Sequence, residues 1–435
     1  MKGLKSGIKL YEHQKTGRDF IKSSKYVLIG DEPGLGKSLQ ALAVMSEIPG
    51  LKIIICPSFL RFNWRTEINK FTNMTCKVVD SKTEYIKVPE VLISSYENVK
   101  NIPSELLPVF IVLDESHYIK NLKASRTKAV MNLMSYSQPE YFVALSGTPI
   151  LNNVTEFFTI LKLLSCCPSK TNGIPIAQKS QYGFSIKFSN SSTRNITVPS
   201  KGGTRSVSLT EFKGVRNIEL LKRYLKGKFL RRLAKNVIDL PKVTYVPFVV
   251  DTKKSKATDS LYKAYSQWVE GNIQSDHITH LKISSAMSKV PYTAKLAIEL
   301  LSQREKVVIF SDHKDPVDLL KKTIEAAGFT VRLLTGDIDS TTRDQSVNAF
   351  QNGNLDCIIG TIKAASIGIT LTASRNLIYN DFSWIPADME QADRRVNRIS
   401  QERPVTITYV LNGEFDIKLQ DKISTKRKEI KQVYE

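Results

Sequence analysis

The feature that most constrains the fold is a set of short apolar segments that recurs twice along the 435-residue chain. None of these segments alternates apolar and polar residues, and turn or polar residues bound each one, which is typical of parallel strands covered on both faces. The first set comprises Tyr26–Ile29, Ile53–Cys56, Val91–Ser94, Phe110–Leu113 and Phe142–Leu145. The second set comprises Val307–Phe310, Val331–Leu334, Cys357–Ile359, Leu377–Tyr379 and Val405–Val410. The stretches between them, such as Leu39–Ile48, are long enough for crossover helices.

The two sets predict an α/β chain with two doubly wound parallel sheets, one over residues 1–165 and one over residues 290–435. Residues 166–289 lack this pattern and are predicted to form a basic insertion and a helical linker between the lobes. Between Lys162 and Lys242 there are 17 Lys and Arg residues but only three acidic residues. Most of the net charge of +21 therefore arises in this stretch.

The insertion contains two predicted elements. Phe184–Phe188 and Asn195–Val198 alternate in polarity on either side of Asn190–Arg194, which predicts a β-hairpin over about residues 182–208. Glu219–Lys235 has apolar residues near helical spacing and is predicted to be a basic helix. Its charge makes the insertion a candidate for phosphate contacts, and a solvated linker surface is the alternative. The candidate contacts are Lys187, Arg194, Arg231 and Arg232.

Charge and cysteine content narrow the class of protein. A net charge of +21 favours a polyanionic partner, and nucleic acid is the first candidate because the sequence has no lipid-anchor motif. The longest apolar runs, such as Val109–Leu113, are too short to cross a bilayer, and the N-terminus lacks the apolar segment of a secretory signal. Five cysteines, none in C-x-x-C spacing, argue against a disulfide framework. We therefore expect a reducing, cytoplasmic environment and no membrane partner.

A glycine-rich turn, Gly34–Ser38, follows the first apolar segment and precedes a predicted helix. Its glycines let backbone N–H groups approach phosphate oxygens, and the helix start adds a favourable dipole. Lys37 supplies a positive charge for the β- and γ-phosphates, and Ser38 supplies a hydroxyl for Mg²⁺. The strict P-loop pattern has glycine where Asp31 stands. A plain strand–helix turn is the alternative to a nucleotide site.

Two acidic residues, Asp114 and Glu115, follow the apolar segment Phe110–Leu113. Ligands of α/β sheets bind at the carboxyl ends of the strands, so these side chains are expected beside the glycine-rich turn. Phosphoryl transfer to water needs a carboxylate in the Mg²⁺ shell and a base for the attacking water, and Asp114 and Glu115 suit these two roles. Together the two segments predict ATP hydrolysis.

These segments resemble motifs of superfamily 2 helicases of the Swi2/Snf2 class. That class reads D-E-x-G-L-G-K-[ST], as Asp31–Ser38 does, which accounts for the missing first glycine. Further segments that resemble motifs of the class, in the same order, are Tyr11–Gln14, Cys56–Trp64, Ser94–Glu97, Leu145–Pro149, Lys306–Ser311, Gly360–Thr370 and Gln391–Gln401. The likeness fails only over about residues 166–215 and 245–290. Pro33, Arg394 and Ser400 depart from the usual motif residues.

The resemblance implies ATP and Mg²⁺ as cofactors and assigns roles to site residues. The implied nucleotide-binding residues are Gln14, Gly34, Leu35, Gly36, Lys37, Ser38, Gly368, Arg395 and Arg398, with Gln14 in contact with the adenine base. The implied catalytic residues are Lys37, Asp114, Glu115, Arg395 and Arg398, with Ser38 and Asp114 as Mg²⁺ ligands. The implied DNA contacts are Ser58, Asn63, Trp64, Ser94, Tyr96, Ser311, Thr361 and Lys363. Arg395 and Arg398 are three residues apart, which predicts one face of a helix, with Arg398 as the arginine finger.

The resemblance also implies an ATP-dependent translocase or helicase that contacts the backbone of duplex or branched DNA without sequence preference. The two lobes and the insertion account for the length of the chain, which leaves no room for the added domains of chromatin remodellers. Remodelling of forks or Holliday junctions in replication, recombination or repair therefore fits better than chromatin remodelling. In length and motif wording the chain is similar to compact bacteriophage-encoded branch-migration helicases and to the motor of fork-remodelling annealing helicases. A monomer is expected, in the host cytoplasm if a phage encodes it. An RNA helicase of superfamily 2 and an ATPase-inactive DNA-binding scaffold remain as alternatives.

Overall fold

The computed structural model describes residues 3–80, 83, 85, 87–149, 154–166, 180–200, 203–237, 240–250, 276–365, 368–398 and 400–431. The chain forms two compact units, Met1–Val237 with Lys426–Glu435, and Ile238–Thr425. Each unit contains its own parallel β-sheet, so the prediction of an α/β chain with two RecA-like lobes is confirmed. Among the described residues, no helix is both long enough and apolar enough to cross a membrane.

The first unit is built on a seven-stranded sheet with the order β3-β4-β2-β5-β6-β1-β9, and its neighbouring strands pair in parallel. Its strands are β1 (Tyr26–Ile29), β2 (Lys52–Cys56), β3 (Cys76–Val78), β4 (Val91–Ser95), β5 (Phe110–Leu113), β6 (Tyr141–Leu145) and β9 (Phe229–Leu230). The five strands predicted here are confirmed. The sheet also contains β3 and β9, which the apolar pattern did not predict.

Both faces of this sheet are covered, because neighbouring residues of one strand belong to different hydrophobic clusters. Leu28 and Leu113 lie in one cluster, and Val27 and Val112 lie in another. The α-helices of the unit are α1 (Glu12–Ser24), α2 (Lys37–Met45), α3 (Arg61–Phe71), α4 (Ser125–Ser137), α5 (Phe158–Leu164), α6 (Gln181–Phe188) and α7 (Ile218–Leu225). Its 3-10 helices are η1 (Ser58–Leu60), η2 (Val99–Asn101), η3 (Ser116–Ile119), η4 (Val154–Phe157) and η5 (Ala234–Asn236).

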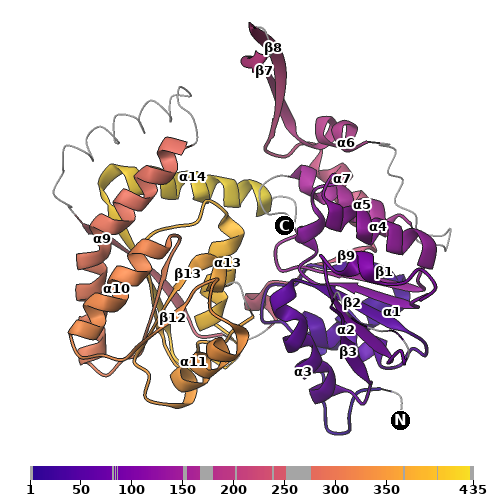
Figure 1. The fold of residues 1–435 in the computed structure, drawn as a ribbon, viewed down its shortest axis with the longest axis horizontal. Helices are drawn as coiled ribbons and strands as arrows, with labels where there is room; N and C mark the ends of the chain where they lie inside the picture. The colour runs from indigo at the N-terminus through magenta and orange to yellow at the C-terminus, as the bar shows by residue number, and fades with distance from the viewer. Residues whose placement is uncertain are drawn as a thin grey trace. The chain divides into compact units, whose positions relative to one another are not determined.

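The predicted β-hairpin exists, but it begins later in the chain than expected. Its strands are β7 (Asn190–Ser200) and β8 (Gly203–Lys213), which pair antiparallel and extend away from the sheet beyond α6 (Figure 1). The segment predicted as its first strand is instead the helix α6. Ser180 caps this helix by accepting a bond from the Gly183 N–H, and Phe184 and Phe188, one turn apart, are both buried.

The basic helix predicted over Glu219–Lys235 is wrong beyond its second turn. Helix α7 ends at Leu225, and Gly227 follows with a φ of 74°, a left-handed conformation that favours glycine. The chain then adds Phe229–Leu230 to the edge of β1 as strand β9. Edge pairing satisfies backbone groups of β1 that would otherwise lack partners, and this gain outweighs the local helical pattern.

The second unit contains a six-stranded parallel sheet with the order β10-β15-β14-β11-β13-β12. Its strands are β10 (Val243–Val250), β11 (Val307–Ser311), β12 (Val331–Leu334), β13 (Cys357–Thr361), β14 (Asn376–Tyr379) and β15 (Val405–Asn412). The helices among its described residues are α9 (Asp276–Ser302), α10 (Lys314–Ala326), α11 (Ser340–Asn352), α12 (Ile362–Ala365), α13 (Pro386–Val396) and α14 (Gly413–Lys431), of which the residues from Lys426 belong to the first unit. Helices α9 and α10 lie side by side (Figure 1). The five strands predicted for this lobe are confirmed.

The stretch 166–289 is not a unit of its own, in contrast to the predicted domain boundaries. Its first part up to Val237 belongs to the first unit, and the part from Ile238 belongs to the second. Strand β10 lies within the predicted linker but pairs with β15 over its whole length. Pro247 has no N–H to donate within the sheet, and the edge position of β10 tolerates it.

Candidate functional site

The glycine-rich turn lies between β1 and α2, where the backbone geometry requires glycine. Gly34 has a φ of 93° and Gly36 a φ of 74°, both in the left-handed region. Gly36 immediately precedes α2, and a Cβ atom there would lie 2.4 Å from the side-chain nitrogen of Gln14. Lys37 and Ser38 therefore begin α2 directly after a turn that is packed against α1.

Gln14, predicted to read the adenine base, lies on the buried side of α1 against this turn. Its Oε1 accepts the backbone N–H of Tyr11 at 3.1 Å, and its Nε2 donates to the carbonyl of Leu35 at 3.5 Å. His13 places its Nε2 3.1 Å from the same carbonyl. The glutamine is thus fixed beside the phosphate-binding turn, and its contact with a base stays a prediction.

The ammonium group of Lys37 lies within a cluster of acidic side chains. Its Nζ donates to the backbone carbonyl of Asp31 at 2.9 Å. Burial lowers the pKa of Lys37, and the negative charges of Glu115, Asp31 and Asp114 act in the opposite direction. The charges of both carboxylates at the end of β5 therefore act on this lysine.

Asp114 is held by two hydrogen bonds to its carboxylate. Trp64 Nε1 donates to Oδ2 at 2.8 Å, and the backbone N–H of Glu115 donates to Oδ1 at 2.9 Å. Burial and the neighbouring charge of Glu115 raise the pKa of Asp114 to about 7, although Trp64 and Lys37 act to lower it. A cation bound here would favour the charged form, so this carboxylate fits a Mg²⁺ ligand.

Glu115 adopts a left-handed conformation with a φ of 47°, at the junction of β5 and η3. Its Oε2 lies 3.3 Å from Nδ1 of His117, and that nitrogen also lies 3.4 Å from the hydroxyl of Ser146. Burial lowers the pKa of His117 to about 4, so the imidazole is neutral near pH 7. Ser146 in turn accepts the backbone N–H of Thr148 at 3.2 Å, so the loop after β6 is joined to the acidic pair.

Four side chains predicted to contact DNA are buried in this structure, and their role at DNA stays a prediction. The four are Trp64, Ser94, Tyr96 and Ser311, each at most 1% exposed. The hydroxyl of Tyr96 donates to the carbonyl of Asp114 at 2.8 Å, and that of Ser311 donates to the carboxylate of Asp381. Burial explains the bonds of the two aromatic residues, because a buried indole or phenol needs a hydrogen-bond partner inside the protein.

The other predicted DNA contacts lie at the surface or partly buried. Ser58, Asn63 and Lys363 are exposed, and Thr361 and Lys187 are partly buried. Lys187 lies over the rings of Phe188 and Tyr224. Only the backbone of Arg194, in β7, is described. The role of these residues at DNA stays a prediction.

The sequence predicts Arg231 and Arg232 on a basic helix that faces DNA, but both lie beyond the end of α7. Both follow β9 and contact the phosphate-binding loop. Arg231 Nη1 donates to the carbonyls of Gly30 and Gly147, and Arg232 forms an ion pair with the buried carboxylate of Asp31. No local sequence pattern predicts the ion pair of Arg232 with Asp31, because the two residues are 201 positions apart.

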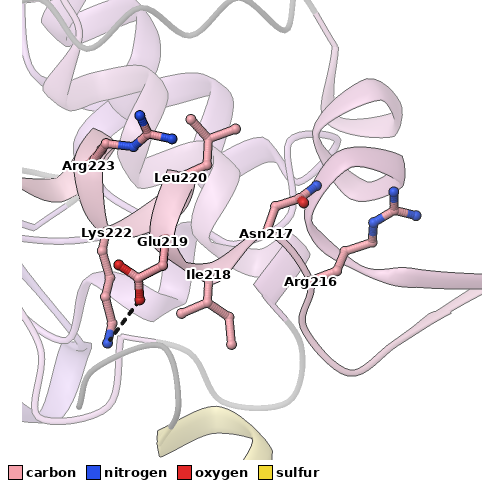
Figure 2. A pocket seen from close by; sticks show the side chains of 7 residues that line it. All are labelled: Arg216, Asn217, Ile218, Glu219, Leu220, Lys222 and Arg223. Atoms are coloured by element: carbon pink, nitrogen blue, oxygen red, sulfur yellow. Dashed lines mark ion pairs between the residues drawn. The ribbon is translucent and has the colours of Figure 1, made fainter.

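The basic surface of this region lies instead at α7 and the residues before it. A groove of about 820 Å³ is lined by Arg216, Asn217, Ile218, Glu219, Leu220, Lys222 and Arg223. Figure 2 shows Arg216 and Arg223 extending from the two ends of this segment, with Lys222 near Glu219. Three basic residues and one acidic residue line the groove, and the chain enters the segment directly from β8.

In the second unit the predicted nucleotide-binding residues lie on two adjoining segments. Arg395 is buried on α13, and its backbone carbonyl accepts the N–H of Leu371. Arg398 Nη1 donates to the carbonyl of Ile369 at 3.1 Å and to the hydroxyl of Thr370 at 2.6 Å. Gly368 has a φ of 44° at the start of that segment. The expectation of one helix face is wrong, because α13 ends at Val396, before Arg398.

The sequence matches the SNF2-related domain over residues 12–308 and the helicase conserved C-terminal domain over residues 289–400. The first match covers more than half of the chain. The chain belongs to the SNF2-related family. The SNF2-related domain includes the whole phosphate-binding loop, the acidic pair and the basic segment of the first unit.

Curated relatives of this SNF2-related chain are larger proteins. It is 27% identical over 423 residues to the SWI/SNF-related matrix-associated actin-dependent regulator of chromatin subfamily A-like protein 1 of Drosophila melanogaster, covering 92% of this chain and 53% of that protein. It is 25% identical over 438 residues to the DNA annealing helicase and endonuclease ZRANB3 of Mus musculus, covering 94% of this chain and 39% of that protein. The chain thus spans about half the length of these relatives or less.

Solved structures similar to this SNF2-related chain include the Sulfolobus solfataricus SWI2/SNF2 ATPase core in complex with dsDNA. The identity is 23%, the match covers 98% of this chain and 93% of that one, and the TM-score is 0.44. The ATPase core domain of the same organism without DNA matches with the same identity and TM-score.

Proposed function

We propose that the chain is an ATP-dependent DNA translocase that remodels branched DNA, with its hydrolytic site in the first unit. The observation that carries this proposal is the position of Lys37. Its ammonium group donates to the backbone carbonyl of Asp31 in the turn, and the negative charges of Asp114 and Glu115 act on it. A lysine at a glycine-rich helix start beside two strand-end carboxylates is the constellation that phosphoryl transfer needs.

The residues present fit ATP and Mg²⁺. Backbone N–H groups of the turn and Lys37 would hold the phosphates, and Ser38 and Asp114 would hold the metal ion. Among the described residues no cluster of three or more His, Cys, Asp or Glu side chains could hold a metal, so Mg²⁺ here would take its remaining ligands from phosphate and water. Bound Mg²⁺–ATP would supply the phosphoryl group that is transferred to water.

Glu115 is proposed as the base that orients the attacking water and accepts its proton. Its Oε2 lies beside the neutral His117, which keeps the carboxylate oriented without a competing positive charge. The bond network from His117 to Ser146 ties this base to the loop after β6. That loop belongs to Leu145–Pro149, which resembles a motif of the Swi2/Snf2 class, so a change in its position would move the base.

Arg395 and Arg398 are proposed to assist turnover from the second unit. This proposal rests on their place in Gln391–Gln401, which resembles a motif of the Swi2/Snf2 class, and on the bonds that join Arg398 to Ile369 and Thr370. Guanidinium groups stabilise charge that develops on a transferred phosphoryl group. Which of the two arginines dominates is decided by substitution.

DNA is the proposed partner, bound through its backbone. The name of the relative ZRANB3, a DNA annealing helicase, supports a DNA substrate, and so does the basic groove at Arg216, Lys222 and Arg223. The hairpin β7–β8 is proposed as the wedge that separates strands or guides a junction, since it extends beyond the folded body of its unit (Figure 1).

The test is ATP hydrolysis by the purified chain over a panel of forked, four-way, linear and single-stranded DNAs and RNA. We expect branched DNA to stimulate hydrolysis most and Lys37→Ala to abolish it. Lys22→Ala, which changes a half-buried lysine of α1 that pairs with Glu47, is the matched control and is expected to retain activity. Preference for RNA would support an RNA helicase instead, and hydrolysis that is absent in the wild type would support a DNA-binding scaffold.

A further inference from the structure

The segment Phe229–Arg232 lies directly against the start of the phosphate-binding loop. Strand β9 pairs in parallel with β1, and the N–H groups of Leu28 and Gly30 each donate to β9 or its neighbour at 2.7 Å. The ring of Phe229 covers Gly30 so closely that a Cβ atom on that glycine would lie 2.3 Å from it. Strand β9 therefore holds the start of the loop at Gly30 in place.

Arg231 joins two backbone turns that flank Lys37. Its Nη1 donates to the carbonyl of Gly30 at 2.8 Å and to the carbonyl of Gly147 at 3.0 Å. A Cβ atom on Gly147 would lie 2.8 Å from Pro33 and 3.5 Å from the Lys37 ammonium nitrogen. The arginine thus holds the turn after β6 against the phosphate-binding loop.

Arg232 holds the same loop from its other side. Its backbone N–H and its Nε both donate to Oδ1 of Asp31, at 3.1 Å and 3.0 Å. The same guanidinium donates to the side chain of Gln40 on α2 and to the carbonyl of His13 on α1. Asp31 is fully buried, and its own carbonyl accepts the Lys37 ammonium.

The burial of Asp31 and Arg232 favours their ion pair over a contact between Arg232 and DNA. A fully buried carboxylate is costly unless it is paired and hydrogen-bonded, and Arg232 supplies both the charge and the bonds. The Arg232 side chain is 13% exposed, so little of it is available to a phosphate group outside. Asp31 stands where the strict P-loop has glycine, and the arginine compensates for the charge that the aspartate brings.

We propose that Arg231 and Arg232 are positioning residues for nucleotide binding, which set the loop Gly30–Lys37 in its phosphate-binding conformation. The inference rests on the proposed ATP function. It makes the segment after α7 part of the nucleotide site, with the DNA contact left to the basic groove before it. A shift of this segment would change the position of Lys37 through Asp31.

The test measures binding of a fluorescent ATP analogue and of a DNA fork, separately, with the full chain. We expect Arg232→Gln to weaken binding of the analogue by about tenfold or more, the factor that corresponds to about 1.4 kcal/mol, and to leave fork binding and its salt dependence unchanged. The matched control is Arg223→Gln, an exposed arginine of α7, which should weaken fork binding and leave analogue binding unchanged. The double variant Asp31→Asn/Arg232→Gln removes the lone buried carboxylate and should recover part of the lost affinity.

Arg231→Lys keeps the charge and the fold but cannot bridge two carbonyls in the same way, so it gives a readout if Arg232→Gln fails to fold. It should also weaken binding of the analogue and spare fork binding. Unchanged analogue affinity in both variants, or a reduced salt dependence of fork binding, overturns the inference. A wild-type chain that binds no analogue overturns the proposed ATP function itself, so the two failures are distinguishable.

Discussion

Trp64 donates its indole N–H to the Oδ2 atom of Asp114 over 2.8 Å. The tryptophan lies on α3 and is 1% exposed, so the bond forms in the protein interior. It stabilises the ionised carboxylate and therefore opposes the burial that raises the pKa of Asp114. A residue predicted to contact DNA thus supports the proposed Mg²⁺ site.

Trp64→Phe is predicted to weaken the use of Mg²⁺. Loss of the N–H donor raises the pKa of Asp114 further, because one bond to the charged form is removed. A hydrogen bond to a charged group contributes about 1.5–3 kcal/mol, so the Mg²⁺ concentration for half-maximal hydrolysis is expected to rise about tenfold or more. The measurement is a Mg²⁺ titration of ATP hydrolysis at constant pH.

Tyr96→Phe is the control for this prediction. It also removes a buried bond to Asp114, but that bond goes to the backbone carbonyl and not to the carboxylate. The variant is expected to unfold at a lower temperature while it retains the Mg²⁺ requirement of the wild type. An equal shift in both variants would mean that Trp64 acts through general stability and not through the carboxylate.

Arg398→Ala is predicted to lower turnover by about 10³-fold or more, the scale of an arginine finger, with little change in ATP affinity. Single-turnover hydrolysis and analogue binding measure the two effects separately. Arg394→Ala, on α13 four residues earlier, is the matched control and is expected to retain turnover. Unchanged turnover in Arg398→Ala would move the role to Arg395.

The pH dependence of stability is predicted to contain a contribution from His117. Burial holds the pKa of this imidazole at about 4, below its ordinary value of 6.5. Between these values the unfolded chain binds the proton more tightly, so stability falls as the pH falls from 6.5 to 4, by at most about 3 kcal/mol. Above 6.5 the group makes no pH-dependent contribution.

The measurement compares unfolding midpoints at several pH values for the wild type and His117→Gln. The variant should lose less stability than the wild type between pH 6.5 and 4. His280→Gln, at an exposed position of α9, should retain the wild-type slope. Parallel curves for the wild type and His117→Gln would show that the imidazole is not protected from protons in the folded state.

Much of the fold could be predicted because the parallel strands leave a local signal. Each of the ten predicted strands is a short apolar run, and burial on both faces of a sheet removes the need for alternation. The glycine-rich turn was equally local, since the left-handed conformations of Gly34 and Gly36 admit few other residues.

The remaining features depend on contacts between distant residues. Strand β9 has two residues within a basic stretch, so no period marks it, and its partner β1 lies some 200 positions earlier. Motif and charge predict DNA contacts for Trp64 and Arg232, but their partners Asp114 and Asp31 are evident only in the folded chain. The sequence patterns therefore indicate that Trp64 and Arg232 are functional residues, but they do not predict the residues that these two contact.

The hairpin is predicted to be dispensable for hydrolysis and required for moving a junction. Residues 190–213 are replaced by a short Gly/Ser linker, which is feasible because Asn190 and Lys213 are paired neighbours at its base. Helix α6 must be kept, since Phe184 and Phe188 belong to the core of the unit. DNA-stimulated hydrolysis should persist while branch migration is lost, and migration at the wild-type rate would show that the hairpin is not a wedge.

The proposed ATP hydrolysis depends most on Glu115 as the base, and one substitution tests this role directly. Glu115→Gln keeps the size and the hydrogen bonding of the side chain but removes its basicity, so turnover on a forked duplex is expected to fall about 10²–10⁴-fold. Binding of the ATP analogue and of DNA should be retained, and Glu140→Gln, at an exposed position, should hydrolyse ATP like the wild type. Hydrolysis by Glu115→Gln at the wild-type rate would contradict the proposed role of Glu115 as the base.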